Sequence, residues 1–478
     1  MNYKVILHTL GVVLCFEAAC MLLPLGCALI YGESDWSVFL ISIAISLAVG
    51  AILFSLKPKN KNFYAKEGYA IVALSWILMS IFGSLPFILS GSINGFVPAL
   101  FETVSGFTTT GATVISDVEA LSKSVLFWRS FTHWIGGMGV LVFLLVLLPT
   151  SGGSNFFLMK AESPGPSVGK LVPRVRSSAK ILYLIYLCLT LVQIIFLWAG
   201  EMDLFEAITH TFGTAGTGGF GIKNSSIAEY STYSQVVITV FMILFGIDFS
   251  VYYLLLMRKF ASALRSEEVR TYLGIILIAI TIICINCYKL FENIGECIKH
   301  AAFQVASIFT TTGYATVDFD AWPELSKAIL LLLMFVGACA GSTGGGIKVS
   351  RIIIFLKSIA KEIKLAAHPK SMHKIHMNGR IVEHETVRMV NVYMAAYLLI
   401  FFVSILLVSI NNFDFTTNVT AVAATLNNVG PGMSLVGPTK NFALFSPFSL
   451  LVLIFDMLAG RLEIFPVLIL FAREAWKK

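Results

Sequence analysis

Four short segments of small residues around a glycine recur along the chain. They are Phe107-Thr-Thr-Thr-Gly111-Ala, Thr217-Gly-Gly219-Phe, Phe309-Thr-Thr-Thr-Gly313-Tyr and Leu426-Asn-Asn-Val-Gly430-Pro. Glycine permits backbone conformations that turn carbonyl oxygens toward a common axis, and rings of carbonyls can replace the hydration shell of a cation. A single Thr-Thr-Thr-Gly run is more often a packing surface or a turn. Four runs at equivalent places predict a pore with one wall from each.

The composition indicates which elements hold these segments. Of the 478 residues, 57% are hydrophobic and 13% are charged, and the mean hydropathy is +0.84. Soluble globular chains of this length do not have such a composition. We count ten apolar runs, most of them long enough to cross a bilayer of about 30 Å at ~1.5 Å per residue. Their ranges are 4–30, 36–56, 69–90, 124–149, 180–200, 234–257, 270–290, 325–362, 386–411 and 444–472.

The charged residues indicate how these segments are oriented. Most of the 34 Lys and Arg residues fall in alternate connections and near both termini, whereas the opposite connections carry an excess of Asp and Glu. The positive-inside rule places the basic side and both termini in the cytoplasm. This asymmetry also explains the net charge of +7, which therefore gives no argument for nucleic-acid binding. An acidic outer side would attract cations, although acids that simply evade the inside rule produce the same pattern.

Each glycine segment lies in an outer connection, after a moderately apolar stretch that is too short to span. These stretches cover 96–108, 204–216, 296–310 and 416–426, the length of a re-entrant pore helix. We therefore predict an all-α integral membrane protein with four repeats of helix, pore helix, filter loop and helix around a pseudo-fourfold pore. The predicted divisions are an N-terminal helix pair at 1–66 and repeats at 67–160, 161–260, 261–380 and 381–478.

Several of these strings resemble a known family. The four filter segments of the Trk/Ktr/HKT superfamily of potassium transporters are similar to Ser105-Gly-Phe-Thr-Thr-Thr-Gly111, Thr217-Gly-Gly-Phe220, Thr310-Thr-Thr-Gly313 and Asn427-Asn-Val-Gly430-Pro-Gly432. The resemblance extends to Arg129-Ser-Phe-Thr-His-Trp-Ile-Gly-Gly-Met-Gly139 and Asp456-Met-Leu-Ala-Gly-Arg461-Leu-Glu-Ile-Phe-Pro466. It covers nearly the whole chain, and the N-terminal helix pair resembles the bacterial TrkH branch more than the KtrB branch.

The resemblance implies a potassium-translocating subunit with a four-glycine selectivity filter. The matching filter positions are Thr109, Thr110, Gly111, Thr217, Gly218, Gly219, Thr311, Thr312, Gly313, Asn428, Val429 and Gly430. Plant relatives that prefer sodium carry a serine at the first glycine, so Gly111 indicates potassium. The second segment has Gly218 in place of a threonine, and the fourth is built on asparagines. Such an asymmetric filter selects less stringently than a fourfold one, which leaves a sodium leak open.

A second group of glycines interrupts the apolar run 325–362. The string Gly341-Ser-Thr-Gly-Gly-Gly-Ile-Lys348 holds four glycines within six residues, which breaks a helix. Non-helical backbone at this depth is tolerated where protein or water satisfies its polar groups, so we expect the loop to line the pore. The resemblance agrees, because the family has an intramembrane gating loop in its third repeat. The predicted gate comprises Gly341, Ser342, Thr343, Gly344, Gly345, Gly346 and Lys348, together with Arg461.

Arg461 is a lone guanidinium in an apolar run. Such a charge costs about 2.5–3.5 kcal/mol at a helix centre on insertion scales unless it finds partners. At ~1.5 Å per residue, Arg461 and Gly341 lie at similar depths below the outer ends of their segments. We infer that Arg461 donates to carbonyls of the 341–346 loop and closes the pore by occupancy and by positive potential. The alternative is an anchor that snorkels to the cytoplasmic headgroups.

Asp248 is a carboxylate within an apolar span, where the resembling family usually has asparagine. A cation contact, a proton carrier and a protonated acid satisfied by its neighbours all remain open. A proton carrier would favour the alternative function, a symporter that moves potassium with protons or sodium. A membrane enzyme would need convergent catalytic groups near the midplane, and the apolar spans supply only scattered ones.

The cytoplasmic connections are short and contain no nucleotide-binding fold, so control by a nucleotide must come from another chain. The string Gly216-Thr-Gly-Gly-Phe-Gly221 matches G-x-G-x-x-G, but no βαβ unit surrounds it. The resemblance implies a homodimer in a bacterial inner membrane, paired with a cytosolic ring of TrkA-like nucleotide-binding regulatory subunits. The basic stretches 160–180 and 348–380 are candidate docking surfaces, with lipid headgroups as the alternative partner. Potassium is expected as the transported ion.

Overall fold

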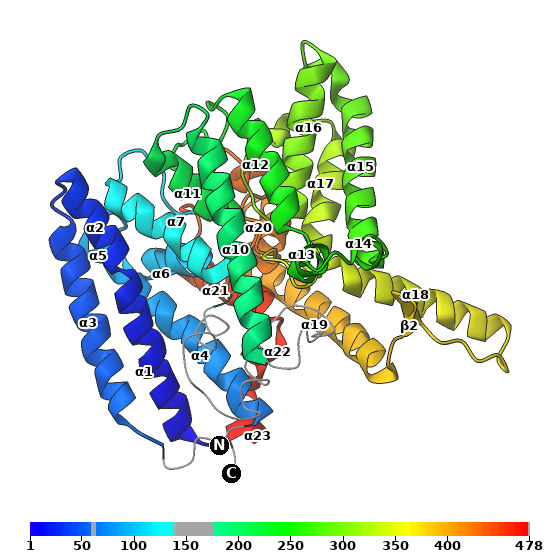
Figure 1. Cartoon of the computed structure of the whole chain (residues 1–478), viewed down its shortest axis with the longest axis horizontal. Helices are drawn as coiled ribbons and strands as arrows, with labels where there is room; N and C mark the ends of the chain where they lie inside the picture. The colour runs from blue at the N-terminus through cyan, green and yellow to red at the C-terminus, as the bar shows by residue number, and fades with distance from the viewer. Residues whose placement is uncertain (59–63, 138, 140–174, 477–478) are drawn as a thin grey trace.

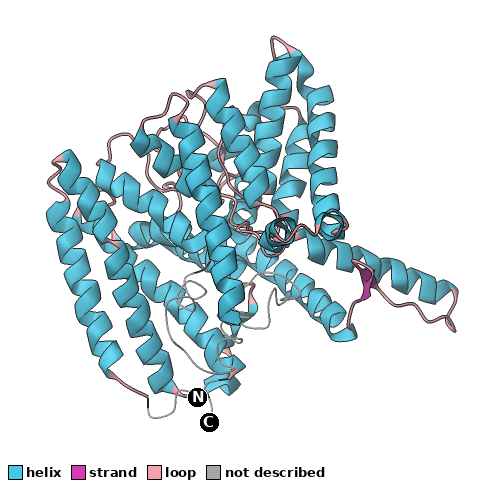
Figure 2. Cartoon of the chain, in the orientation of Figure 1, coloured by secondary structure: helices cyan, strands magenta, loops and turns pink. Residues whose placement is uncertain are grey.

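The structure is a computed structural model that describes residues 1–58, 64–137, 139 and 175–476. Helices dominate this part of the chain (Figure 2), which confirms the predicted all-α class. The two described strands, β1 (His376–Met377) and β2 (Arg380–Ile381), form a short antiparallel hairpin in which His376 pairs with Ile381. Most of predicted span 124–149 beyond Gly139, and the stretch 160–174 of the predicted docking surface, lie outside the described residues.

The helices follow one another with short connections. In the first half of the chain they are α1 (Tyr3–Cys20), α2 (Leu22–Tyr31), α3 (Trp36–Ser55), α4 (Ala65–Gly83), α5 (Leu85–Leu89), α6 (Phe96–Phe107), α7 (Lys123–Gly137), α10 (Val175–Trp198), α11 (Leu204–Ala215), α12 (Thr232–Phe245) and α13 (Phe249–Leu256).

The second half continues the pattern of long helices and short re-entrant ones. Its α-helices are α14 (Phe260–Leu264), α15 (Glu267–Cys287), α16 (Ile294–Phe309), α17 (Glu324–Val336), α18 (Val349–Ala367), α19 (His384–Val408), α20 (Phe415–Leu426), α21 (Pro447–Arg461), α22 (Phe465–Leu468) and α23 (Arg473–Trp476). The short 3₁₀ turns are η1 (Tyr288–Leu290), η2 (Phe319–Ala321), η3 (Ser409–Asn411), η4 (Ser434–Val436) and η5 (Ile469–Phe471).

Six helical segments of the described chain are long and apolar enough to cross a membrane: Tyr3–Tyr31, Trp36–Ser55, Ala65–Leu89, Ala179–Trp198, Glu267–Leu290 and His384–Asn411. A seventh crossing is formed if α12 and α13, which bend by 90° at their junction, count as one span. The predicted runs 325–362 and 444–472 are not continuous helices, because the glycine loop divides the first and α21 ends at Arg461. The ten apolar runs therefore include broken segments as well as straight helices.

The N-terminal helix pair packs closely because glycines remove side chains from its interface. A Cβ added at Gly11 of α1 would lie 2.4 Å from the backbone nitrogen of Phe54, and one added at Gly50 of α3 would lie 2.9 Å from Cys15 Sγ. Figure 1 shows α1 and α3 side by side at one edge of the molecule, with α4 next to them. The pair thus forms an outer layer against the first repeat.

Polar N-caps define where the short pore helices begin. Asp203 accepts a hydrogen bond from the backbone nitrogen of Glu206 at the start of α11, and Asn293 does the same for Glu296 in α16. Asp414 caps α20 by accepting from Thr417 N at 2.9 Å. Such side chains satisfy donors that the first helical turn leaves unpaired. The caps hold the outer ends of these helices, so that their C-terminal ends meet inside the protein.

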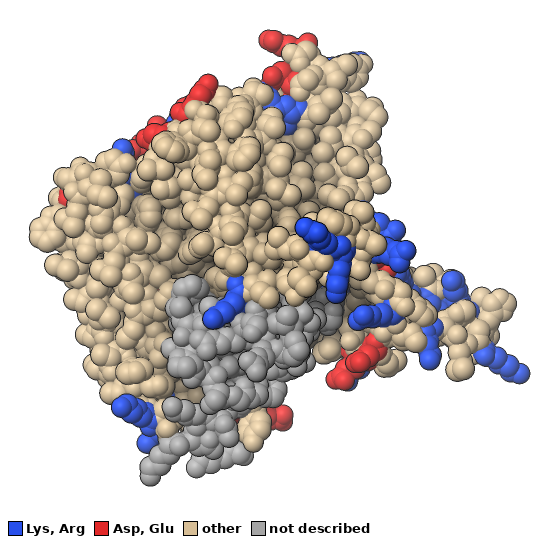
Figure 3. Space-filling model, in the orientation of Figure 1, with Lys and Arg blue, Asp and Glu red and all other residues tan. Residues whose placement is uncertain are grey.

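The charges are unevenly distributed over the molecule. Acidic side chains gather along the upper rim in Figure 3, whereas Lys and Arg cluster lower down, largely around α14 and the protruding α18–α19 arm. The N- and C-termini lie together at the lower end in Figure 1, and Tyr3 Oη donates to the carbonyl of Trp476 at 3.0 Å. Both termini therefore lie at the end of the molecule opposite the acidic rim.

Candidate functional site

The four filter loops share one backbone conformation. We name them filter loop 1 (108–111), filter loop 2 (216–219), filter loop 3 (310–313) and filter loop 4 (427–430). Two residues after each pore helix, a non-glycine residue adopts positive φ: Thr109 (55°), Thr217 (52°), Thr311 (60°) and Asn428 (55°). Two residues later a glycine does so again: Gly111 (83°), Gly219 (76°), Gly313 (84°) and Gly430 (100°). The loops are therefore structurally equivalent although their sequences differ.

The same glycines bring the four loops into a closed ring. Each glycine faces the carbonyl oxygen of the residue that precedes the glycine of the next loop. A Cβ added at Gly111, Gly219, Gly313 or Gly430 would lie, respectively, 2.0 Å from Gly218 O, 1.9 Å from Thr312 O, 2.1 Å from Val429 O and 2.7 Å from Thr110 O. Loop 1 thus meets loop 2, loop 2 meets loop 3, loop 3 meets loop 4, and loop 4 returns to loop 1. Backbone of this kind leaves room only for glycine.

Side chains of the filter loops mainly hold the loops in place. The hydroxyl groups of Thr108 and Thr110 lie 2.8 Å apart, as do those of Thr310 and Thr312. Asn428 Nδ2 donates to Thr110 Oγ1 at 3.0 Å, which joins loop 4 to loop 1. These side chains are fully buried. The backbone oxygens are thus the atoms of the ring left to coordinate an ion.

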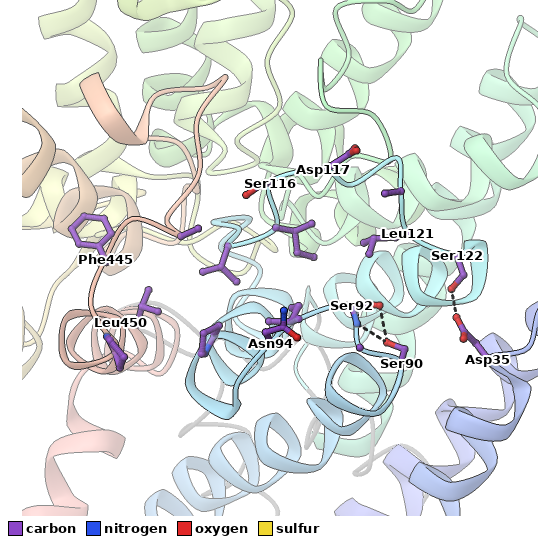
Figure 4. Close-up of a pocket in the computed structure, with 18 residues that line it drawn as sticks. Asp35, Ser90, Ser92, Asn94, Ser116, Asp117, Leu121, Ser122, Phe445 and Leu450 are labelled. Atoms are coloured by element: carbon purple, nitrogen blue, oxygen red, sulfur yellow. Dashed lines mark hydrogen bonds between the residues drawn. The ribbon is translucent and has the colours of Figure 1, made fainter.

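The described residues contain no group of three or more His, Cys, Asp or Glu side chains arranged to hold a metal ion. A cavity of about 750 Å³ lies between the outer connections of the first and fourth repeats, where Ser122 and Asp35 are hydrogen-bonded (Figure 4). Its lining, which includes Asn94, Ser116 and Leu450, contains none of the predicted site residues. The candidate cation site is therefore a ring of backbone oxygens and lies apart from this cavity.

The glycine-rich segment between α17 and α18, which we name the pore loop (337–348), packs directly against the filter. The backbone nitrogen of Gly345 donates to Thr311 Oγ1 at 2.6 Å. A Cβ added at Gly345 would lie 2.4 Å from the carbonyl oxygen of Asn427. The Lys348 ammonium group donates to the carbonyls of Gly344 and Gly345, the latter at 3.0 Å. The pore loop is thus held between filter loops 3 and 4 and folded over a buried lysine.

Arg461 reaches this loop from the end of α21. Its Nη1 donates to the carbonyl of Thr343 at 2.8 Å, which confirms the predicted hydrogen bond to the 341–346 backbone. Its Nη2 also donates to the carbonyls of Gly136 and Gly137, at 2.6 and 2.8 Å. The guanidinium group therefore links the pore loop to the end of α7. The sequence gives no sign of these last two partners, because a backbone carbonyl has no residue-type signature.

Asp248 lies at the bend between α12 and α13. It caps α13 by accepting from the backbone nitrogen of Ser250 at 2.8 Å. The next residue, Phe249, donates its backbone nitrogen to the carbonyl of Gly341 at 3.1 Å. A Cβ added at Gly341 would lie 2.7 Å from Asp248 Oδ1. Asp248 is therefore a neighbour of the pore loop and not of the filter ring.

Glu268 is a second carboxylate beside the pore loop, and the sequence analysis missed it. Its Oε1 accepts from the backbone nitrogen of Ala340 at 2.7 Å and from that of Ser350 at 3.1 Å. One side chain of α15 therefore holds both ends of the segment that contains the pore loop. The available signal was an acidic residue at the start of an apolar span, which reads equally well as a helix N-terminal charge.

Carboxylates at the outer side of the filter are arranged to remain charged. A hydrogen bond from Asn224 lowers the pKa of Asp117 below its ordinary value, and one from Thr417 lowers the pKa of Asp414. A lowered carboxyl pKa means that the group stays ionised at neutral pH. These charges lie in the connections that follow pore helix α6 and precede pore helix α20. They create a negative potential that attracts cations.

Comparisons with known proteins agree with this architecture. The family model of TrkH, described as a cation transport protein, matches residues 36–478. The chain is 35% identical to the Trk system potassium uptake protein TrkH of Escherichia coli K12 over 485 residues, which cover all of both proteins. It is 33% identical to the Trk system potassium uptake protein TrkG of the same organism, over all of this chain and 99% of that protein.

A solved structure is similar over the same extent. The crystal structure of the potassium transporter TrkH from Vibrio parahaemolyticus matches with a TM-score of 0.89 and 32% identity, and the match covers all of both chains. Fold and comparisons together define a multi-pass membrane transporter of cations, as predicted, and not an enzyme. The chain belongs to the TrkH family of cation transport proteins.

Proposed function

We propose that this chain is the potassium-translocating subunit of a Trk-type uptake system and that potassium passes through the ring of four filter loops. The observation that carries the proposal is the closed cycle in which each filter glycine faces a carbonyl oxygen of the next loop. Rings of backbone carbonyls replace the hydration shell of potassium in channels. The names of the relatives, potassium uptake proteins and a potassium transporter, support the choice of ion.

The proposal has a direct test. Expression of the chain in cells that lack their own potassium uptake should restore growth at low potassium. Purified protein in liposomes should take up rubidium, a close substitute for potassium, along its gradient. Absence of rubidium uptake, both in the unmodified protein and in a variant whose pore loop is shortened, would contradict the proposal.

The pore loop and Arg461 form the proposed gate of this pathway. The pore loop bonds to Thr311 in filter loop 3, and Arg461 places a positive charge on the loop carbonyl of Thr343. A cation that has left the filter would meet both the loop backbone and this charge. Closure would therefore combine steric obstruction with electrostatic repulsion.

Replacement of Arg461 by alanine is expected to raise cation flux about tenfold, a change equal to ~1.4 kcal/mol in the barrier. The reason is the loss of both a positive charge in the pathway and a tie between the pore loop and Gly136. Rubidium uptake by proteoliposomes, normalised to the amount of folded protein, measures it. Arg473→Ala, a change at an exposed arginine near the C-terminus, is the control. Flux that stays at the unmodified level would leave Arg461 as an anchor only.

A proton- or sodium-coupled symporter is the second candidate, because Asp248 adjoins the pore loop at Gly341. A carboxylate there could bind the coupling ion as the loop moves. In that case the reversal potential for potassium shifts with the pH or sodium gradient in the unmodified protein, and Asp248→Asn abolishes the shift. Uncoupled conduction instead gives a reversal potential set by potassium alone in both proteins.

The proposed assembly follows from the family resemblance and from the charge distribution. We place both termini and the basic α18–α19 arm in the cytoplasm of a bacterium, with the acidic rim outside the inner membrane. A homodimer that docks a cytosolic, TrkA-like nucleotide-binding subunit would use this basic side. The five-part division at 66, 160, 260 and 380 remains the proposed repeat organisation.

A further inference from the structure

A buried ion pair lies behind the first filter loop. Arg129 of α7 and Glu102 of pore helix α6 approach to 2.7 Å between Nε and Oε1, and the two side chains are 3% and 0% exposed. Among the ion pairs of the described residues, this is the one in which both partners are almost completely buried. Burying two charges is costly, so such a pair persists where its other hydrogen bonds are also made.

Glu102 spends its remaining acceptor capacity on the chain just beyond filter loop 1. Thr113 Oγ1 donates to both carboxylate oxygens, at 3.0 and 3.1 Å, and the backbone nitrogen of Val114 donates to Oε2 at 2.9 Å. Thr113 and Val114 follow Gly111 by two and three residues. The carboxylate therefore fixes the outer exit of loop 1 to its own pore helix.

Arg129 makes the corresponding contacts to filter loop 2. Its Nη1 donates to the carbonyl of Gly221 at 2.8 Å, and its guanidinium carbon lies 3.6 Å from the centre of the Phe220 ring. Phe220 and Gly221 directly follow the filter glycine Gly219. One planar guanidinium group thus joins the exits of two adjacent filter loops, with Nε directed to one and Nη1 to the other. A lysine ammonium cannot reproduce this fork.

The other repeats do not use charge at this position. Nine residues before the filter glycine, the first repeat has Glu102, whereas the others have His210, Gln304 and Ala421. His210 shares a hydrogen bond of 2.9 Å with Tyr230, and Gln304 donates to the Val317 carbonyl at 3.5 Å. The junction of loops 1 and 2 is therefore held by charge-assisted hydrogen bonds, which are stronger than neutral ones.

We propose that Arg129, held by Glu102, is a positioning residue that sets the spacing between filter loops 1 and 2 and thereby favours potassium over sodium. At this junction Gly111 lies directly against the carbonyl of Gly218. A looser junction lets that carbonyl move inward to a smaller ion. The inference rests on the proposed conduction of potassium, and it adds a residue that touches no ion.

The test compares ion preference and not total flux. Full-length protein is reconstituted in liposomes with potassium on one side and sodium on the other, and the reversal potential gives the permeability ratio. Arg129→Lys and Glu102→Gln are each expected to raise the sodium-to-potassium ratio about fivefold, equivalent to ~1 kcal/mol. Glu229→Gln, which breaks the exposed Lys223–Glu229 pair in the outer connection of the second repeat, is the control and should leave the ratio unchanged.

The outcomes separate this inference from the function beneath it. No potassium current in the unmodified protein would refute the proposed function itself. Current in the unmodified protein, with an unchanged ratio in Arg129→Lys and Glu102→Gln, would overturn the inference alone. A purely structural role lowers the amount of folded protein and the current without moving the ratio, so that result also counts against it. If Glu102→Gln fails to fold, Arg129→Lys, which keeps the buried positive charge, decides by itself.

Discussion

Replacement of Gly219 by alanine is expected to reduce rubidium uptake by about a hundredfold or more, equivalent to ~2.7 kcal/mol in the barrier. The added Cβ would lie 1.9 Å from the carbonyl oxygen of Thr312, well inside any permitted contact. Its obstacle is backbone, which cannot rotate away as a side chain can. The residue also has φ of 76°, a left-handed conformation that costs an L-amino acid roughly 1–2 kcal/mol. Relief of the clash must displace an oxygen of the ring.

The matched control is Gly274→Ala on α15, where an added Cβ meets nothing within 4 Å. This variant should retain full uptake, because it changes the same residue type in a membrane helix without touching the ring. Uptake is measured in proteoliposomes and corrected for the fraction of protein that elutes as a single species. Uptake by Gly219→Ala above half of the unmodified level would contradict the filter assignment.

The sequence predicted the pore helices well because their boundaries depend on local chemistry. The expected starts at 204 and 416 compare with Leu204 and Phe415, where Asp203 and Asp414 cap the first turns. The ends are set by the glycine segments themselves. Apolar length, a polar cap and a terminal glycine are all properties of neighbouring residues, so a single chain reveals them.

The contacts between repeats could not be predicted in the same way. The carbonyls of Gly136 and Gly137 that accept from Arg461 lie more than three hundred residues away in the chain. Glu102 and Arg129 could be read from the sequence only as an outer acid and part of a matching string. Partners that are backbone atoms, or that meet only when two repeats close together, leave no pattern in residue types. Their discovery requires the fold.

The structure also refines the question of filter symmetry. The sequence differences at Gly218 and at Asn428 predicted an asymmetric filter. The backbone of the ring is nevertheless nearly fourfold, because the paired positive-φ positions repeat in all four loops. The asymmetry lies in the supports: an Asn428–Thr110 bond between loops 4 and 1, and the Arg129 fork between loops 1 and 2. Selectivity in this chain would then depend on supports that differ from junction to junction.

Deletion of Gly344–Gly346 from the pore loop is expected to raise rubidium flux by at least about tenfold, or ~1.4 kcal/mol in the barrier. The three residues include the closest contacts between the pore loop and the filter, because Gly345 bonds to Thr311 and packs on Asn427. The helices on either side need not move, since Val349 N already donates to Ala338 O at 3.2 Å across the base of the loop. The shorter chain therefore still spans the gap.

The control is an equal deletion, residues 369–371, in the connection that follows α18, where Pro369 and Lys370 are exposed. It should leave flux unchanged, so that a rise in the first variant reports the loop and not a loosened fold. The potassium-to-sodium ratio of the first variant should stay near the unmodified value, because the filter ring is closed by contacts among its own four loops. Faster flux with a lost ratio would mean that the pore loop braces filter loops 3 and 4 as well as obstructing the path. Unchanged flux would mean that the loop is packing, and the gate would then have to lie elsewhere in the pathway.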